Sequence, residues 1–157
     1  MNELSSRPLF RDARRDEIGD IVRLLADDAL GRSREAYGEK QDPAYAEAFD
    51  AIDRDPNNRL IVADVDGRVA GCMQITIIPH LTFKGGRRLQ IEGVRVDSAM
   101  RGRKVGRAMI EWAIDLAREQ RCHLVQLTTN KSREDAIRFY EGLGFEASHI
   151  GCKLDLA

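Results

Sequence analysis

The spacing of apolar and polar residues divides the first half of the chain into helical and extended segments. Apolar residues recur every three or four positions over 16–29 and 45–54, which predicts two amphipathic helices. Segment 31–43 between them carries both charge signs and predicts a loop or a broken helix. Apolar and β-branched runs predict strands at 8–13, 60–65, 69–78 and 89–96. A tight hairpin turn is expected at Asp66-Gly67.

The second half shows the same two periods. A long helix is expected from about Lys104, and an apolar run predicts a strand at 123–129. Ser132-Arg-Glu-Asp135 has the form of a capping box, which predicts that a helix opens there. Gly144 is suited to end that helix, and residues 145–156 alternate loosely as one or two terminal strands.

Together these segments predict an α/β protein with one domain over residues 1–157. The expected architecture is a mixed central sheet of about six or seven strands with about four flanking helices. Its early strands should pair antiparallel, and the strands joined by the long helix should run parallel.

Composition and charge narrow the class of protein. A chain of 157 residues with 43% hydrophobic and 32% charged residues is typical of one ordinary globular domain. Its net charge of −1 argues against nucleic acid or an anionic membrane as the partner. The widely spaced Cys72, Cys122 and Cys152 lack metal-binding spacing and indicate buried, reduced thiols. No apolar leader or membrane-length run is present, so we expect a cytoplasmic protein.

Between the strand at 89–96 and the long helix lies a basic, glycine-bearing junction, Met100 to Ala108. The first N–H groups of a helix lack intrahelical acceptors, and the helix dipole adds positive potential, so this junction suits a phosphate. Gly102 and Gly106 allow a tight turn and close approach by a bulky group. A merely basic helix start is the alternative, although four cations there oppose the dipole.

The junction contains R-x-x-G-x-A, at Arg103 to Ala108, and resembles motif A of the GNAT superfamily of acyl-CoA-dependent N-acyltransferases. Residues 136–145 contain A-x-x-F-Y-x-x-x-G-F, which resembles that family's second signature. The order of predicted elements is also similar to the family's fold across the chain. The resemblance implies an enzyme that transfers an acetyl group from acetyl-CoA, as cosubstrate and without metal, directly to a primary amine of a small molecule or protein.

The resemblance also implies which residues hold the cofactor. Main-chain amides of the junction would bind the pyrophosphate, and the preceding strand, splayed from its neighbour, would pair with the pantetheine arm. The junction residues are Arg101, Gly102, Arg103, Lys104, Val105, Gly106, Arg107 and Ala108. The strand residues are Val94, Arg95 and Val96.

One position departs from the family pattern. Many members carry Asn seven residues before the signature tyrosine, where this chain has Arg133. Arg133 could contact a phosphate, or Asn130 or Ser132 could take the role of that amide. A solvated Arg133 in the first helical turn is the alternative.

Amide formation requires a neutral amine and a proton for the departing thiolate. An amine with a pKa of about 10.4 is neutral roughly once in a few thousand at pH 7, so a general base helps. Glu92 is the carboxylate on the strand that enters the junction, and family members often use a Glu there as the base. The alternative is a solvent-facing strand residue.

Tyr140 aligns with the family's tyrosine, which implies a general acid that protonates the thiolate; a core tyrosine is the alternative. Direct transfer needs no enzyme nucleophile, and none of the cysteines has an evident basic partner, apart from His123 beside Cys122.

The acceptor site is expected from the first helices and the loop before residue 89, with Tyr37, Tyr45, His80, Thr82 and Phe83 as candidates. For each of them a structural role is the favoured alternative. The acceptor itself, the acyl length and homodimer formation are left open. A non-catalytic acyl-CoA-binding sensor with the same fold is the rival hypothesis.

Overall fold

The structure is a computed structural model that describes residues 7–38 and 40–156. The chain divides into two compact units, Met1–Gln126 and Leu127–Ala157, and each is described by itself. One domain over residues 1–157 stays a prediction. None of the described helices has the length and apolar composition that would span a bilayer.

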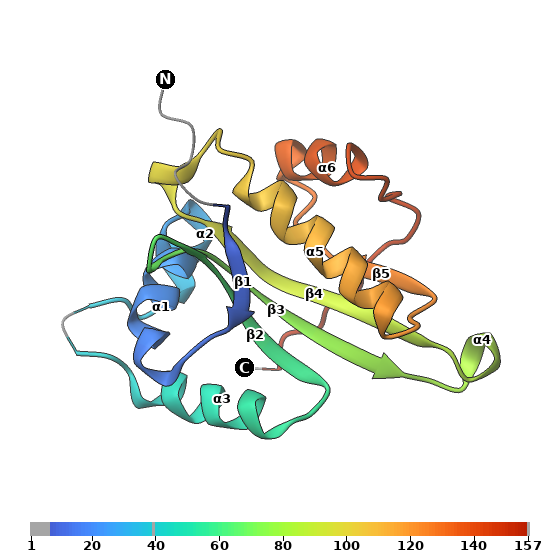
Figure 1. The fold of residues 1–157 in the computed structure, drawn as a ribbon, viewed down its shortest axis with the longest axis horizontal. Helices are drawn as coiled ribbons and strands as arrows, with labels where there is room; N and C mark the ends of the chain where they lie inside the picture. Colours follow the sequence, from blue (N-terminus) through green and yellow to red (C-terminus); the bar gives the residue numbers. More distant parts are fainter. Residues whose placement is uncertain (1–6, 39, 157) are drawn as a thin grey trace. The chain divides into compact units, whose positions relative to one another are not determined.

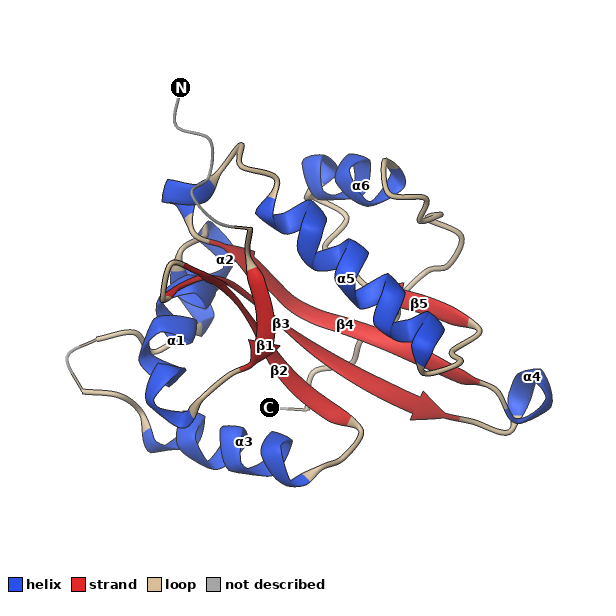
Figure 2. Ribbon diagram, in the orientation of Figure 1, coloured by secondary structure: helices blue, strands red, loops and turns tan. Residues whose placement is uncertain are grey.

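The first unit is built on one sheet with the strand order β1-β2-β3-β4-β5 (Figure 2). The strands are β1 (Leu9–Asp12), β2 (Asn58–Val65), β3 (Arg68–Pro79), β4 (Arg87–Val96) and β5 (Leu124–Leu127). The first four strands pair antiparallel in sequence order. The turn predicted at Asp66-Gly67 joins β2 to β3, with positive φ at both residues.

β5 runs parallel to β4. The His123 N–H donates to the Arg87 carbonyl at 2.8 Å, and the Gln126 side chain donates to the Gln90 side chain at 2.6 Å. Residue numbers therefore rise together on the two strands, as in a parallel pair. The prediction of a mixed sheet is confirmed, but the sheet has five strands rather than six or seven.

The predicted terminal strand is the main error. Residues 145–156 form neither helix nor strand, and Ile150, Leu154 and Leu156 are 93%, 84% and 93% exposed. Alternation marks a segment that could present one apolar face, but a strand also requires a neighbour to pair with. The sequence pattern contains no information about that neighbour.

Six α-helical segments are described, rather than about four. They are α1 (Ile18–Ala26), α2 (Ala29–Arg34), α3 (Pro43–Arg54), α4 (Thr82–Gly85), α5 (Val105–Glu119) and α6 (Glu134–Glu141). The extra α2 lies in the segment expected to be a loop or a broken helix. The extra α4 is one turn at the tip of the β3–β4 hairpin, where Phe83 and Lys84 have φ of 52° and 59° (Figure 1).

The two faces of the sheet are covered by different helices. α5 covers one face of the sheet (Figure 1), and Met109 lies against Gly71 of β3 on that face. Leu89 and Ile91 of β4 are 0% and 1% exposed and share this face, because Ile91 stands opposite Ile75, an even number of residues from Gly71 on β3. On α5, Met109 and Ile110 are fully buried, while an exposed, solvated stripe is formed by Arg107, Glu111, Asp115 and Arg118. The opposite face packs at Val62 and Cys72 against α1.

A buried carboxylate ties β1 to the start of α1. Glu17 is 5% exposed and accepts hydrogen bonds from the Arg11 guanidinium at 2.7 and 3.0 Å. It also accepts from the Arg14 N–H at 2.8 Å. The Arg11 guanidinium donates further to Asp64 of β2 at 2.9 Å, so one cation links three segments. These contacts lower the pKa of Glu17, chiefly through the hydrogen bond from Arg11.

Candidate active site

Glu92 lies on β4, the fourth of five strands, and its side chain is exposed. Among the described residues, the Glu92 carboxylate makes no hydrogen bond and no ion pair. It stands opposite Gln74 of β3, and a register shift follows immediately, with Gly93 at φ 61°. Glu92 is therefore a solvent-facing carboxylate inside a sheet, directly before a β-bulge.

The edge of β4 beyond Glu92 extends past β5. Since His123 stands beside Arg87 and Gln126 beside Gln90, β5 ends at Leu127 level with Ile91. Residues 92–96 therefore continue beyond the end of the short strand. Backbone groups on such an edge can pair with an extended ligand.

Arg95, on the open part of β4, is bound to the segment that joins α1 to α2. The Arg95 guanidinium forms an ion pair with Asp28 at 3.4 Å, and Arg95 Nη1 donates to the Val94 carbonyl at 2.8 Å. Val96, the last residue of β4, pairs with Gly71 of β3. Arg95 therefore fastens the segment before α2 to β4.

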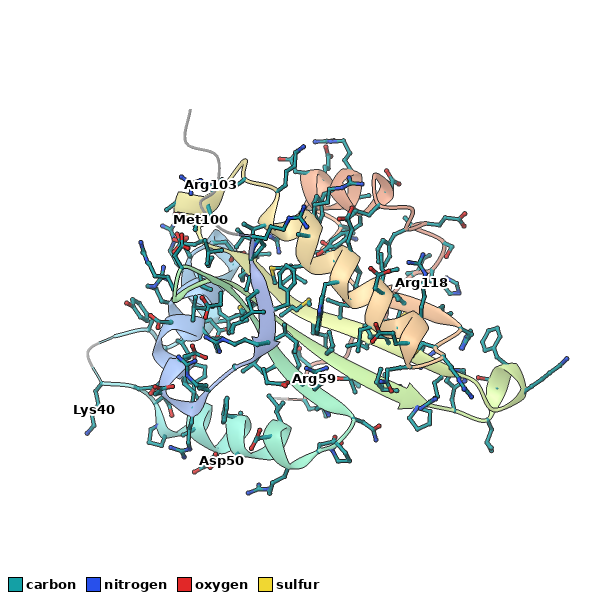
Figure 3. The ribbon with its side chains drawn as sticks, in the orientation of Figure 1. Lys40, Asp50, Arg59, Met100, Arg103 and Arg118 are labelled. Atoms are coloured by element: carbon teal, nitrogen blue, oxygen red, sulfur yellow. The ribbon has the colours of Figure 1, made fainter. Side chains whose placement is uncertain are left out.

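The loop between β4 and α5 makes two left-handed turns. Asp97 accepts from the Ala99 N–H at 2.9 Å and from Arg23 at 3.2 Å, which starts a 3-10 turn at Ser98–Met100. Gly102 then has φ 78°, and Lys104, directly before α5, has φ 60°. Figure 3 shows Met100 and Arg103 on this loop.

The first turn of α5 leaves backbone donors without acceptors. The N–H groups of Val105, Gly106 and Arg107 have no hydrogen-bond acceptor among the described residues, and no side chain caps the helix. Two other amides that were expected to bind the pyrophosphate already have acceptors. The Arg103 N–H donates to the Met100 carbonyl, and the Ala108 N–H donates to the Lys104 carbonyl. Three unsatisfied N–H groups at the positive end of a 15-residue helix suit an anion.

The charges at this helix start differ in their availability. Arg101, Arg103 and Lys104 are exposed, and none makes an ion pair within the described residues. Arg107 instead pairs with Glu111 at 2.8 Å, one turn along the solvated stripe. Val105 is 2% exposed, so its side chain belongs to the core and only its backbone faces the loop.

In the second unit, Tyr140 lies half-buried near the end of α6. Its ring packs edge-on against Phe139 and Phe145, with centroid distances of 5.1 and 5.7 Å. The C-cap of α6 is Gly142, two residues before the Gly144 that the sequence suggested. Gly144 has φ 91° in the turn that follows, and the Phe145 N–H donates to the Tyr140 carbonyl at 3.1 Å. The position of the Tyr140 phenol near the end of α6 is therefore set by its packing against Phe139 and Phe145.

The start of α6 differs from the predicted capping box. The N-cap is Arg133, with no side-chain cap, so the prediction of Ser132 as the cap is wrong. Ser132 instead donates to the Asn130 side chain at 2.8 Å through its hydroxyl and at 3.0 Å through its N–H. An open pocket of about 460 Å³ lies here, lined by Ser132, Arg133, Glu134, Asp135, Ala136 and Arg138.

Of the candidates for the acceptor site, Tyr45 has structural partners, whereas Tyr37 and Phe83 are 59% and 69% exposed. The Tyr45 hydroxyl donates to Glu35 at 2.8 Å and accepts from the Ala36 N–H at 2.9 Å. All three cysteines are free; Cys72 is buried, but Cys152 is exposed, so the expectation of three buried thiols is wrong. Burial raises the pKa of Cys72 to about 12.

Two features of the site were not predicted. The bulge at Gly93 re-aims the strand after Glu92, and the only local signal was a glycine inside a strand pattern. Asp97 caps the 3-10 turn with which the loop after β4 begins. The clue in the sequence was an aspartate at the start of a turn. No group of three or more His, Cys, Asp or Glu side chains that could hold a metal occurs over 7–38 and 40–156.

Comparison with known proteins identifies relatives of this arrangement. The family model described as "Acetyltransferase (GNAT) family" matches residues 21–145. Aminoalkylphosphonate N-acetyltransferase of Salmonella typhimurium is 34% identical over 110 residues, which cover 68% of this chain and 69% of that protein.

Two solved structures have a similar fold. A protein from Bacillus halodurans, described as a transcriptional regulator, is 47% identical with a TM-score of 0.92, and the match covers 95% of this chain and 99% of that one. A protein from Clostridium acetobutylicum, described as a predicted acetyltransferase and solved with acetyl-CoA, is 19% identical with a TM-score of 0.71. That match covers 95% of this chain and 96% of the other.

Proposed function

Because the chain belongs to the GNAT family of acetyltransferases, we propose that it transfers an acetyl group from acetyl-CoA directly to a primary amine. The observation that carries this proposal is the set of free N–H groups at Val105, Gly106 and Arg107, directly after the open edge of β4. The diphosphate of the cofactor accepts from these amides, and exposed Arg101, Arg103 and Lys104 add positive charge around them.

The remaining cofactor contacts follow the chain on both sides of the junction. The pantetheine arm pairs with the backbone of Val94, Arg95 and Val96, and the main chain at Gly102 and Ala108 borders the phosphates. In the second unit, Asn130 and Arg133 are the proposed polar contacts of the cofactor, because Arg133 lines the pocket at the start of α6.

Glu92 acts as the general base in this proposal. Deprotonating a lysine-like amine at pH 7 costs on the order of 4–5 kcal/mol, and a positioned carboxylate, directly or through water, takes the proton as the bond to the acetyl carbon forms. The exposed, unpaired side chain of Glu92 supports the role, because a solvated carboxylate is accessible to an incoming amine. The acceptor is a small amine, which the name of the Salmonella relative supports.

Tyr140 acts as the general acid. When the tetrahedral intermediate collapses, the C–S bond breaks and the phenol donates its proton to the CoA thiolate. No enzyme-bound acetyl intermediate is formed in this proposal. Burial raises the pKa of Cys72 and Cys122, which makes either thiol a poor nucleophile.

The test is CoA release from acetyl-CoA with a panel of amines. We expect Tyr140→Phe to lower kcat by roughly 10²- to 10⁴-fold while CoA affinity is retained. Acetyl-CoA binding with no turnover on any amine would overturn the enzyme and favour a sensor.

A further inference from the structure

One half of a sheet face in the first unit is polar across four strands. The register places Asn58 of β2 opposite Thr76 of β3, and Thr76 opposite Gln90 of β4. Gln126 of β5 donates to Gln90 at 2.6 Å and continues the row. Directly opposite residues share a face of the sheet, so these four side chains form one row perpendicular to the strands.

A second row lies beside the first. Gln74 of β3 stands opposite Glu92 of β4, and the Gln74 amide donates to the Asn58 side chain at 3.2 Å. The Thr76 hydroxyl donates to the same Asn58 oxygen at 2.6 Å. The polar side chains are thus already connected to one another, which orients them without a ligand.

These residues lie where a sheet normally presents apolar side chains. Further along the same face, Cys72 is 1% exposed and packs against α1. The alternate positions of β4, Leu89 and Ile91, are buried under α5. Half-buried amides and hydroxyls contribute little to a core, so this polar area is better explained by a polar ligand than by stability.

Arg88 completes the face and lacks a counter-ion. It precedes Gln90 and Glu92 on the same side of β4, opposite Ile78. Its side chain is half-buried, its Nε is fully buried without a hydrogen-bond acceptor, and it makes no ion pair with any described residue. A buried guanidinium nitrogen without an acceptor is costly. An oxyanion of a ligand would satisfy it through a bidentate pair of hydrogen bonds.

We propose that this face binds the acceptor, and that Arg88 binds an oxyanion of an acceptor whose amine lies at Glu92. The proposal rests on the proposed transfer and extends it by naming the acceptor class: a small amine that carries a phosphate, phosphonate or carboxylate group. The Cα atoms of Arg88 and Glu92 are about 13 Å apart on an extended strand, and both side chains shorten that gap. Gln90 lies between them and bonds polar groups in the middle of the acceptor.

The experiment compares two acceptors that share the aminopropyl chain, aminopropylphosphonate and aminopropanol. Each is tested as a substrate of the wild type, Arg88→Gln and Arg87→Gln. Arg87 is the matched control because it is the adjacent arginine and lies on the opposite face of β4. We expect wild-type kcat/KM to favour the phosphonate by roughly 10- to 100-fold. Arg88→Gln should abolish that preference without lowering kcat/KM for aminopropanol, and Arg87→Gln should retain it.

Arg88→Met and calorimetry separate the outcomes. Because Met keeps the apolar stem and removes an unpaired charge, we expect an equal or higher Tm without ligand. Binding of aminopropylphosphonate to the CoA-saturated protein tests the anion site without turnover. Binding that depends on Arg88 but gives no acetylation would support the anion site and refute the transfer. Equal binding of the two probes, or a preference that survives in Arg88→Gln, overturns the inference.

Discussion

A Cβ atom on Gly71 would stand 2.9 Å from the Sδ of Met109, because α5 lies directly on β3 at this point. The same Cβ would stand 2.9 Å from the Arg95 carbonyl oxygen. The thioether of Met109 can rotate away from such a Cβ atom. The Arg95 carbonyl belongs to the backbone, so it can make room only if β4 itself shifts. Gly71 also pairs with Val96, so its size sets how closely α5 approaches the end of β4.

Gly71→Ala should therefore destabilise the protein by about 1–3 kcal/mol, as overpacking does. The free energy of unfolding is measured by denaturant titration. Gly19→Ala is the control, since a Cβ there meets nothing within 4 Å on the exposed side of α1, and it should raise stability by about 0.5–1 kcal/mol. Equal effects from both substitutions would contradict the close approach of helix and strand.

The buried carboxylate of Glu17 should make stability depend on pH. Its pKa is lowered in the folded protein by the Arg11 guanidinium, from about 4.3 in an unfolded chain. The stability from this pair is therefore complete above the unfolded pKa and is lost as pH falls through the folded pKa. Glu17→Gln should reduce stability at pH 7 by roughly 1–3 kcal/mol and make the acid limb less steep.

Denaturant melts from pH 7 to pH 3 provide the measurement. Asp50→Asn is the control, because its ion pair with Arg15 at 3.1 Å is exposed and should contribute no resolvable change. If the free energy of unfolding of Glu17→Gln falls as steeply between pH 7 and pH 3 as that of the wild type, other groups determine the loss of stability in acid.

Lys104 combines a left-handed backbone with a charge beside the free amides. Lys104→Gly should raise stability by about 0.5–1 kcal/mol, because glycine adopts φ 60° without strain. Lys104→Ala loses the same charge and keeps the strain, so it should not gain stability. Both substitutions should weaken CoA binding equally in calorimetry; weakening by the glycine variant alone would mean that backbone rigidity, and not charge, matters.

The three thiols should react at different rates. Cys152 is exposed and should react promptly with a disulfide reagent at pH 8, while the buried Cys72, with a pKa of about 12, should react only on unfolding. Because direct transfer uses no cysteine, turnover should survive complete modification of Cys152. Loss of turnover with retained CoA binding would point to a covalent route.

The sequence predicted the parts of the fold that local pattern determines. The hairpin at Asp66-Gly67, the strand ending at Val96 and the helix starting at Val105 all lie within two residues of their expected bounds or at them. These elements combine a clear period with strong turn chemistry. The strand–loop–helix junction could be predicted for the same reason.

Features that depend on distant residues were missed. Ser132 matched a capping box, but its hydroxyl donates to Asn130 instead, a competition that the motif alone does not reveal. Residues 145–156 alternate without forming a strand. The polar rows through Thr76 and Gln90 required the register of four strands, which no single segment contains.

The bulge at Gly93 reverses the parity of β4. Before it, the even-numbered Gln90 and Glu92 lie on the polar face of the sheet, half-buried and exposed respectively, while Leu89 and Ile91 fill the core. After it, the odd-numbered Arg95 stands opposite Cys72 and shares the face of Glu92, three residues away. A strand arranged in this way can diversify on one side while its other side keeps the protein folded. Substitutions of a few residues on the polar face can therefore change what this strand presents, with no change to the scaffold beneath them.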